Sequence, residues 1–273
     1  MSCSSYSVLL NVCNAEKPEW LSIALNSMLN QTIKPNEFVL VQNGPLTDDL
    51  YATIKRYQED FPELFKILPL PKNVSVGLAL QQGVLACSNG FIAYVDADGY
   101  SVPTRIEEEF EAMFEKKVDM VGSIVDEFVD STDNVIAHRF FPESPAEIYR
   151  LAKRRTPMAH SSVLFKKRMV LACGNYEDFY LAEDYALFIN LLSICAKGYN
   201  IQKTLVYKRV CEDSYEQRRS WKYFKTMFLF NNKFFKTRWF SCRDYVVRSI
   251  ASGFDCLMPG AVRNFIGNKD SVR

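Results

Sequence analysis

Two aspartates, Asp96 and Asp98, directly follow the apolar segment Phe91–Val95 and are separated by a single alanine. Like charges this close repel one another, and they lose hydration where the end of a buried strand is covered. A divalent cation relieves both costs. Mg²⁺ and Mn²⁺ prefer oxygen ligands, commonly one or two carboxylates completed by substrate phosphates. The pair therefore predicts a metal site, and the alternative is two solvated turn residues before Gly99.

A second acidic pair, Glu183 and Asp184, stands at the predicted start of a helix within residues 181–199. The helix dipole favours a carboxylate in the first turn and keeps it ionised. Such a group could act as a general base on a hydroxyl that comes within hydrogen-bonding reach. Ordinary capping of the helix N-terminus is the competing interpretation.

Histidine and arginine supply the remaining candidates. His160, in "TPMAHSSVLF", is one of only two histidines, and it either lines a binding site or has a structural role. Arg209, Arg218 and Arg219 fall in "YKRVCEDSYEQRRSW". Guanidinium groups bind phosphates through paired hydrogen bonds, so these three could clamp a diphosphate. A solvated basic surface is the alternative.

Apolar strands and amphipathic helices alternate through the N-terminal part of the chain. Strands are predicted at 6–14, 36–44, 65–70 and 90–96, and helices at 17–31, 46–60 and 76–88. This order indicates βαβ units, and hence a parallel sheet covered on both faces. Ligands bind such sheets beyond the carboxyl ends of the strands. Asn14 and Asn43 stand at predicted strand ends, as do Asp96 and Asp98.

The following part of the chain is less regular. Two strands are predicted at 119–130 and 135–141, around the turn "STDN". A buried helix is predicted at 181–199, with an apolar face from Leu187 to Cys195 and with Gly198 as the residue that ends it.

Composition limits the class of protein. The 273 residues are 48% hydrophobic and 24% charged, as in globular proteins. The net charge of +1 hides an asymmetry: residues 221–273 hold ten Lys/Arg and three Asp, or +7, which leaves −6 for residues 1–220. Eight cysteines without a CxxC pair favour buried thiols in a reducing compartment. No signal peptide and no run near the ~20 apolar residues of a membrane-spanning helix is evident, so we expect a cytoplasmic protein.

The segment 221–240 contains nine aromatic residues, five Lys/Arg and no acid. Such mixing is typical of an interfacial helix, with cations facing anionic headgroups and rings at the acyl boundary. A helix packed on the domain is the second interpretation. Nucleic-acid binding by stacking is the third, and we expect no nucleic-acid partner.

Taken in order, these segments resemble bacterial glycosyltransferase family two, the inverting GT-A enzymes of surface polysaccharide biosynthesis. The likeness covers residues 6–225, including "NVSVGLALQQGVLACSNGFIAYVDADGYSVPTRIE" and "YEDFYLAEDYALFINLL". It implies an α/β, Rossmann-like GT-A fold with a mostly parallel central sheet. Residues 1–220 would form the catalytic domain, with a nucleotide-binding part at about 1–100 and an acceptor part at about 101–220. Residues 221–273 would form a basic, aromatic helical extension.

The resemblance also implies roles for individual residues. Asp96 and Asp98 would match the DxD motif, which binds Mn²⁺ or Mg²⁺ and the donor's diphosphate and ribose. Asp184 would match the catalytic base, and Glu183 would support it or contact the acceptor. The other implied donor-binding residues are Asn11, Asn14, Glu16, Asn43, His160, Arg209, Arg218 and Arg219.

Two positions depart from the family pattern. Relatives commonly carry an Asp where this chain has Asn43, at a position associated with the uracil ring, and often a third acidic residue where it has Gly99. Asn43 keeps an acceptor oxygen and adds a donor, so contact with a base remains feasible. The departure leaves the identity of the donor nucleotide open.

The resemblance implies a metal-dependent enzyme that moves a sugar from a nucleotide diphosphate, a UDP-sugar, to a lipid-linked glycan. Inversion of an α-linked donor would give a β-glycoside for O-antigen, capsule or related glycans. The basic extension would bind the inner face of the cytoplasmic membrane. The alternatives are a nucleotidyltransferase and a non-catalytic nucleotide- or glycan-binding module. The first needs a glycine-rich loop after the first strand, where "NVCNAEKPEW" has no glycine.

Overall fold

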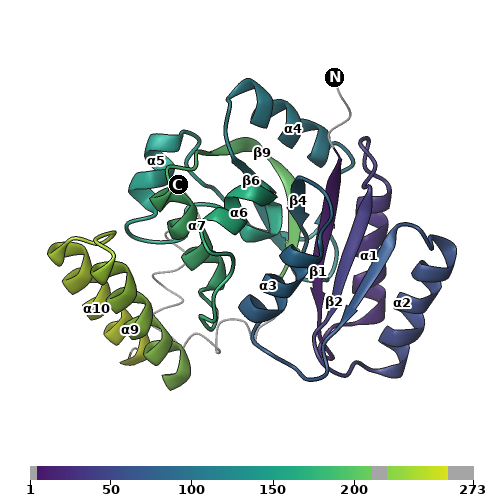
Figure 1. Ribbon diagram of the computed structural model, residues 1–273, viewed down its shortest axis with the longest axis horizontal. Helices are drawn as coiled ribbons and strands as arrows, with labels where there is room; N and C mark the ends of the chain where they lie inside the picture. Colours follow the sequence, from purple (N-terminus) through teal and green to yellow (C-terminus); the bar gives the residue numbers. More distant parts are fainter. Residues whose placement is uncertain (1–4, 211–219, 258–273) are drawn as a thin grey trace.

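The predicted alternation of strands and helices produces a mixed sheet with helices on both faces (Figure 1). The computed structural model describes residues 5–210 and 220–257, and the described residues form one nine-stranded sheet. Its N-terminal half holds four parallel strands in the order β3-β2-β1-β4. Their bounds are β1 Tyr6–Val12, β2 Glu37–Gln42, β3 Phe65–Pro69 and β4 Phe91–Tyr94. The parallel sheet predicted for this part of the chain is confirmed.

Side chains of β1 alternate between two hydrophobic cores, one on each face of the sheet. Val8 and Leu10 belong to one core and Leu9 to the other. The first core is covered by α1 Pro18–Leu29, α2 Asp48–Asp60 and α4 Arg105–Glu115. The second is covered by α3 Val76–Ala86, α5 Pro145–Leu151, α6 Lys167–Ala172 and α7 Glu183–Ser193. A strand that is apolar on both faces suits this position between two helical layers.

The C-terminal half of the sheet mixes strand directions. Its strands are β5 Tyr100–Ser101, β6 Met120–Phe128, β7 Val135–Arg139, β8 Leu164–Lys166 and β9 Gly198–Arg209. β8 lies antiparallel between β4 and β6, and β9 runs parallel to β6. β5 and β7 pair antiparallel with β9 and β6. The strands predicted around "STDN" are therefore confirmed, whereas β8 is too short to show a period in the sequence.

The helix that begins at Glu183 ends earlier than the sequence predicted. Its last residue is Ser193, and Cys195 is exposed with a left-handed φ of 64°. Gly198 opens β9 instead of ending the helix. The glycine is closely packed, because a Cβ there would lie 3.0 Å from Met120 Cε and 3.3 Å from Met158 Sδ. The prediction of Gly198 as the residue that ends the helix is therefore wrong.

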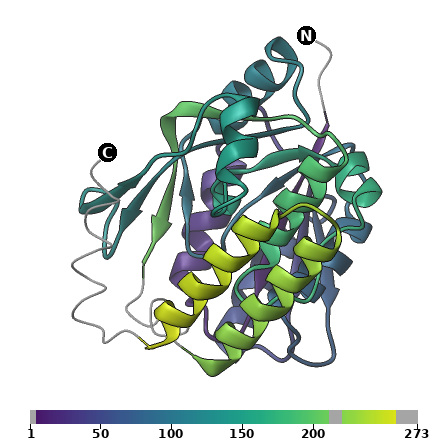
Figure 2. The same ribbon diagram turned by 90° about the vertical axis from the view of Figure 1, so that its left-hand side faces the viewer.

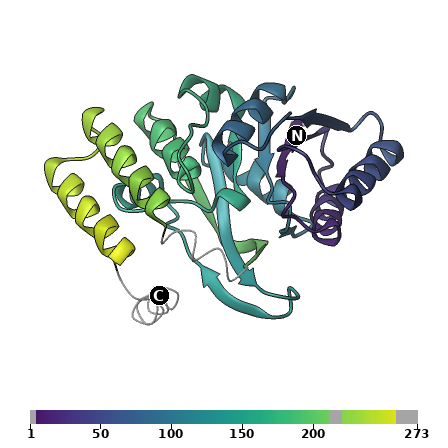
Figure 3. The same ribbon diagram turned by 90° about the horizontal axis from the view of Figure 1, so that it is seen from below.

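The C-terminal extension is a pair of antiparallel helices, α9 Trp221–Lys236 and α10 Cys242–Leu257, at one end of the molecule (Figures 2 and 3). Phe230 and Phe234 of α9 join the core that α7 covers. The aromatic segment is thus partly a packed helix, as the second interpretation held. Within the described ranges, no helix combines the length and apolar character needed to cross a bilayer.

Candidate active site

The carboxyl ends of β1, β2 and β4 meet at one edge of the sheet, because these strands are parallel neighbours. Asn14 is exposed and Glu16 is half-buried on the segment that follows β1. Asn11 lies near the end of β1, and its Oδ1 is buried without a hydrogen-bond partner among the described residues. A buried acceptor without a partner suits a ligand that brings a donor group.

Asn43, just after β2, is 2% exposed and uses its side chain inside the protein. Its Nδ2 donates to the Val74 carbonyl at 3.0 Å, and its Oδ1 accepts from the Val74 amide at 2.8 Å. Asn73 Nδ2 donates to the Asn43 carbonyl at 3.1 Å. An aspartate could not make the first of these bonds. The amide at position 43 therefore joins the end of β2 to the loop before α3.

Asp96, Asp98 and Glu16 form an acidic group beyond the strand ends. Burial first, and then the charges of Asp98 and Asp96, raise the pKa of Glu16 to about 7. Burial and the charge of Asp96 raise the pKa of Asp98 to about 6, against opposing contributions from Lys208 and Arg209. Lys208 Nζ lies 3.7 Å from Asp96 Oδ2. Burial is the largest cause of both shifts, and for Asp98 the nearby Lys208 and Arg209 offset it only in part.

A divalent cation would offset the burial and the mutual repulsion of these carboxylates. Hard cations take carboxylate oxygens, and Asp96 and Asp98 follow the strand within one turn. No three His, Cys, Asp or Glu side chains in the part of the chain that the structure describes are grouped as a complete ligand set. A cation bound here would therefore need further oxygens, and the phosphates of a substrate are the usual source.

Three aromatic side chains connect the two sides of the site. Tyr94 donates to Asp96 Oδ1 at 2.9 Å, and its ring stacks on His160 with centroids 3.8 Å apart. His160 Nε2 lies 2.6 Å from the Tyr176 hydroxyl. Burial lowers the pKa of His160, while the charges of Asp184 and Asp96 both act to raise it. His160 therefore contacts the tyrosine that binds Asp96, and it lines a cavity together with Asp184. The sequence did not reveal Tyr94 and Tyr176, because a buried tyrosine looks like any core aromatic.

Asp184 lies in the first turn of α7, as predicted, and lines a cavity of about 590 Å³ together with His160. Its Oδ1 accepts from the Tyr185 amide at 2.7 Å, which fixes the direction of the carboxylate. Glu183 does not line this cavity and instead packs beside Gly77 at the start of α3. Of the predicted pair, Asp184 alone faces the space where a substrate hydroxyl could sit.

Arg209, predicted as part of a diphosphate clamp, is largely enclosed. Its guanidinium lies between the rings of Trp20 and Phe128, at 4.6 and 4.5 Å from their centroids. Its Nη1 donates to the carbonyls of Val129 and Asp130. Arg209 also lines the cavity, so it adds charge there. Arg218 and Arg219, the other members of the predicted clamp, lie outside the described residues.

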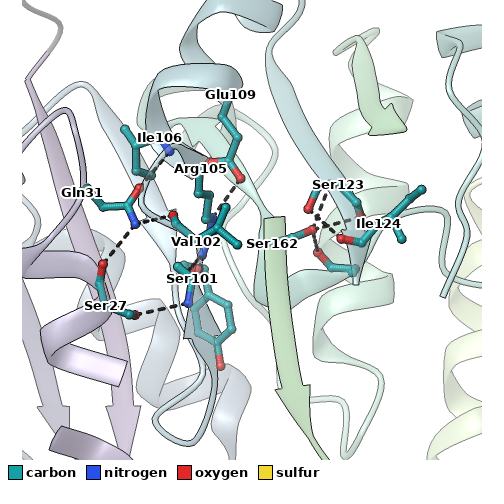
Figure 4. Close-up of polar contacts among 12 residues, drawn as sticks. Ser27, Gln31, Ser101, Val102, Arg105, Ile106, Glu109, Ser123, Ile124 and Ser162 are labelled. Carbon is teal, nitrogen blue, oxygen red and sulfur yellow. Dashed lines mark hydrogen bonds and ion pairs between the residues drawn. The ribbon is translucent and has the colours of Figure 1, made fainter. Parts of the chain in front are cut away.

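A buried arginine, Arg105, braces the turn that carries Asp96 and Asp98. Figure 4 shows its contacts with Ser101 and Glu109. Arg105 has no exposed surface, and its Nη2 and Nη1 donate to the Tyr94 carbonyl and to Ser101 Oγ, both at 3.0 Å. Its Nε donates to Glu109 Oε1 at 2.9 Å, also without solvent exposure. Arg105 thus ties together the residues on either side of the turn.

Comparisons with known proteins agree with this geometry. The family model "Glycosyl transferase family 2" matches residues 7–173. The amylovoran biosynthesis glycosyltransferase AmsE of Erwinia amylovora is 32% identical over 222 residues, which cover 81% of this chain and 82% of that protein. An Escherichia coli protein named UDP-Gal:alpha-D-GlcNAc-diphosphoundecaprenol beta-1,3-galactosyltransferase is 29% identical over 265 residues, 97% of this chain and 95% of that one.

The fold is similar to that of Staphylococcus aureus TarS 1-349, with a TM-score of 0.59 at 19% identity over 79% of this chain. The chain spans 63% of that structure. TarS 1-349 has also been solved in complex with UDP-GlcNAc, and that structure gives a TM-score of 0.58 at 18% identity, covering 79% of this chain and 64% of that one.

The sheet order, the helices on both faces and the carboxylates at the strand ends define a GT-A fold. Since the family model matches well over half of the sequence, the chain belongs to glycosyltransferase family 2. It is therefore a glycosyltransferase, as the resemblance implied, and the nucleotidyltransferase alternative is wrong.

Replacing Asp98 with asparagine should stabilise the metal-free protein at pH 7.5. A folded pKa of about 6 against an ordinary 3.8 means that ionisation disfavours the fold, increasingly as the pH rises through this window and fully above it. Each unit of pKa shift corresponds to about 1.4 kcal/mol. Thermal unfolding in EDTA should thus show a higher melting temperature for Asp98→Asn at pH 7.5, and a smaller gain at pH 5. Asp133→Asn, on an exposed turn, is the control. A rise in melting temperature that is the same at both pH values would contradict an origin in the ionisation of Asp98.

Two variants that lack the Arg105 guanidinium should differ in stability but should both bind the nucleotide weakly. Arg105→Met leaves Glu109 buried without its partner and should destabilise the fold by about 3–5 kcal/mol. Arg105→Met/Glu109→Leu removes both charges and should recover much of that loss. Because the turn still lacks its brace, binding of UDP with Mn²⁺ should remain weak in both variants. Urea unfolding and calorimetric titration measure the two effects. Full recovery of UDP affinity in the double variant would exclude a positioning role.

Proposed function

We propose that the protein is an inverting, metal-dependent glycosyltransferase that moves a sugar from a UDP-sugar to a lipid-linked glycan in surface polysaccharide synthesis. One observation carries the proposal: His160 stacks on Tyr94, which donates to Asp96, and His160 also lines the same cavity as Asp184, so the strand-end carboxylates and Asp184 belong to one site. Metal ligands and a base on opposite sides of one site are the arrangement that in-line displacement at a sugar carbon requires.

The proposed donor site lies at the carboxyl ends of the parallel strands. Asp96 and Asp98 would hold Mn²⁺ or Mg²⁺, which when bound would neutralise the charge that develops on the leaving diphosphate. Asn11, Asn14 and Glu16 would lie against the nucleotide. UDP is supported by two similar proteins: the name of the E. coli relative specifies UDP-Gal, and the solved TarS complex contains UDP-GlcNAc. Asn43 would act through the loop that it holds and not through direct contact with the base.

The acceptor half rests on Asp184. Its carboxylate would accept the proton of the acceptor hydroxyl as that oxygen attacks the sugar carbon from the side opposite the diphosphate. Attack from that side inverts the configuration, so an α-linked donor would yield a β-glycoside. His160, kept neutral by burial, would line the site between donor and acceptor. Glu183 would hold the start of α7 in place.

A lipid-linked acceptor places the reaction at a membrane surface, and the helical extension would bind there. The outer face of α9 carries Trp221, Phe228 and Leu229, which are 72%, 50% and 54% exposed. Lys222 and Lys225 are exposed beside them. Apolar side chains flanked by lysines suit an anionic lipid surface. The protein would then be peripheral on the inner face of the cytoplasmic membrane, with residues 1–220 as the catalytic domain and 221–273 as the membrane-facing extension.

Asp184→Asn should lower the rate of transfer by about 10²–10⁴-fold, the usual contribution of a general base. UDP-Gal and a GlcNAc-diphospho-lipid, the pair named for the E. coli relative, are the first substrates to test. Glu183→Gln is the matched control, with a smaller effect expected because Glu183 does not line the cavity. Binding of UDP with Mn²⁺ should be unchanged. Near-normal turnover by Asp184→Asn would exclude it as the base.

Membrane binding is testable with vesicles. The wild-type protein should sediment with vesicles containing phosphatidylglycerol, more weakly with phosphatidylcholine alone, and less at high salt. Phe228→Glu/Leu229→Glu should reduce binding to anionic vesicles by about tenfold or more. Leu85→Glu on α3, at a side chain 57% exposed, is the control. Equal binding by all three proteins would refute a role for the α9 face.

A further inference from the structure

We propose that Arg154 and Arg155 form a subsite for the diphosphate of the lipid-linked acceptor. The inference rests on the proposed function and extends it to the part of the acceptor that lies beyond the sugar. Its starting point is the cavity that Asp184 and His160 line. Asp96 and Asp98 are not among the residues lining this cavity. Because the carboxylates proposed to hold the donor's metal do not line it, we assign this space to the acceptor.

The cavity is strongly basic. Its cationic lining residues are Arg139, Arg154, Arg155, Lys208, Arg209 and Arg248, and its acidic ones are Glu127 and Asp184. This gives an excess of four positive charges around one space. A neutral glycan needs no such excess, whereas a diphosphate carries at least two negative charges and binds guanidinium groups through paired hydrogen bonds.

Most of these cations already have contacts within the protein. Arg139 pairs with Glu127 at 2.7 Å, Lys208 lies near Asp96, and Arg209 is enclosed by rings and carbonyls. For Arg154 and Arg155, by contrast, no side-chain hydrogen bond or ion pair joins them to any described residue, and both are exposed. Their guanidinium groups are thus the ones available to a ligand.

The backbone that carries the two arginines is held in place. The amides of Arg154 and Arg155 both donate to the Leu151 carbonyl, at 2.8 and 3.0 Å. Arg248 of α10 donates to the Arg154 carbonyl at 2.5 Å and to the Tyr185 hydroxyl at 2.8 Å. Arg248 therefore links the arginine turn to the residue beside Asp184, which sets the distance between the base and the subsite.

The helix that completes the cavity also exposes apolar side chains. Ala251 of α10 lines the cavity, and the neighbouring side chains Val247 and Ile250 are 58% and 57% exposed. The acceptor sugar would then lie at Asp184, its phosphates at Arg154 and Arg155, and its hydrocarbon against α10. A free sugar or a protein acceptor would leave the basic and the apolar side chains unused.

The test uses farnesyl diphosphate in calorimetric titrations of the full chain. EDTA removes metal, so the Asp96–Asp98 site cannot capture the diphosphate. We expect the wild-type protein to bind, and Arg154→Gln/Arg155→Gln to lose at least tenfold in affinity. Arg150→Gln is the control, since it removes one arginine charge, against two in the double variant, from an exposed position on α5 that does not line the cavity. It should stay within about twofold of wild type, because exposed charges acting at a distance are screened by salt.

Three results would overturn the subsite: no binding by the wild type, an equal loss in Arg150→Gln, or inorganic pyrophosphate binding as tightly as farnesyl diphosphate. The last would indicate a site for free phosphates and not for a lipid headgroup. A thermal-shift measurement with UDP and Mn²⁺ distinguishes failure of the acceptor subsite from failure of the proposed function. A normal shift in the double variant shows an intact fold and donor site. If the wild type shows no UDP shift, the proposed function fails regardless of the farnesyl diphosphate result.

Discussion

The turn that carries Asp96 and Asp98 is held by a guanidinium that water does not reach. Arg105 must find all its partners inside the protein, and it finds them in the Tyr94 carbonyl, Ser101 and Glu109. A buried charge left unpaired costs several kcal/mol, so the surrounding chain can move little without losing these bonds. The carboxylates repel one another, and the brace resists the rearrangement by which they would otherwise separate. Their repulsion adds to the effect of burial, and together these raise the pKa of Asp98 to about 6.

The first half of the fold could be predicted from the sequence because each strand is apolar on both faces. Val8, Leu9 and Leu10 need cover on two sides, which only a sheet between helical layers provides. The second half could not be predicted to the same extent. β8 has three residues, and its place between β4 and β6 depends on pairing with distant segments. Gly198 could not be interpreted from the sequence for the same reason, since the methionines that pack against it come from distant segments.

Some residues of the candidate site could likewise be predicted from the sequence, and others could not. Carboxylates are recognisable at strand and helix ends, so Asp96, Asp98 and Asp184 could be named from position and type. The residues that orient them could not. Arg105 sits on an amphipathic helix, where an arginine is ordinarily solvated, and nothing in its local sequence signals complete burial. The prediction for Arg209 shows the converse, because a residue expected to face a ligand has much of its guanidinium occupied by two aromatic rings.

The cavity beside Asp184 is lined by segments that lie far apart in the chain. The match to the family model ends at residue 173, whereas Asp184, β9 and both C-terminal helices come later in the chain. Through Arg248, α10 also holds the turn at Arg154, inside the matched region. One wall of the cavity is thus held together by contacts between residues far apart in the chain. Loss of α10 would remove both its own part of that wall and the hydrogen bond that holds the turn at Arg154.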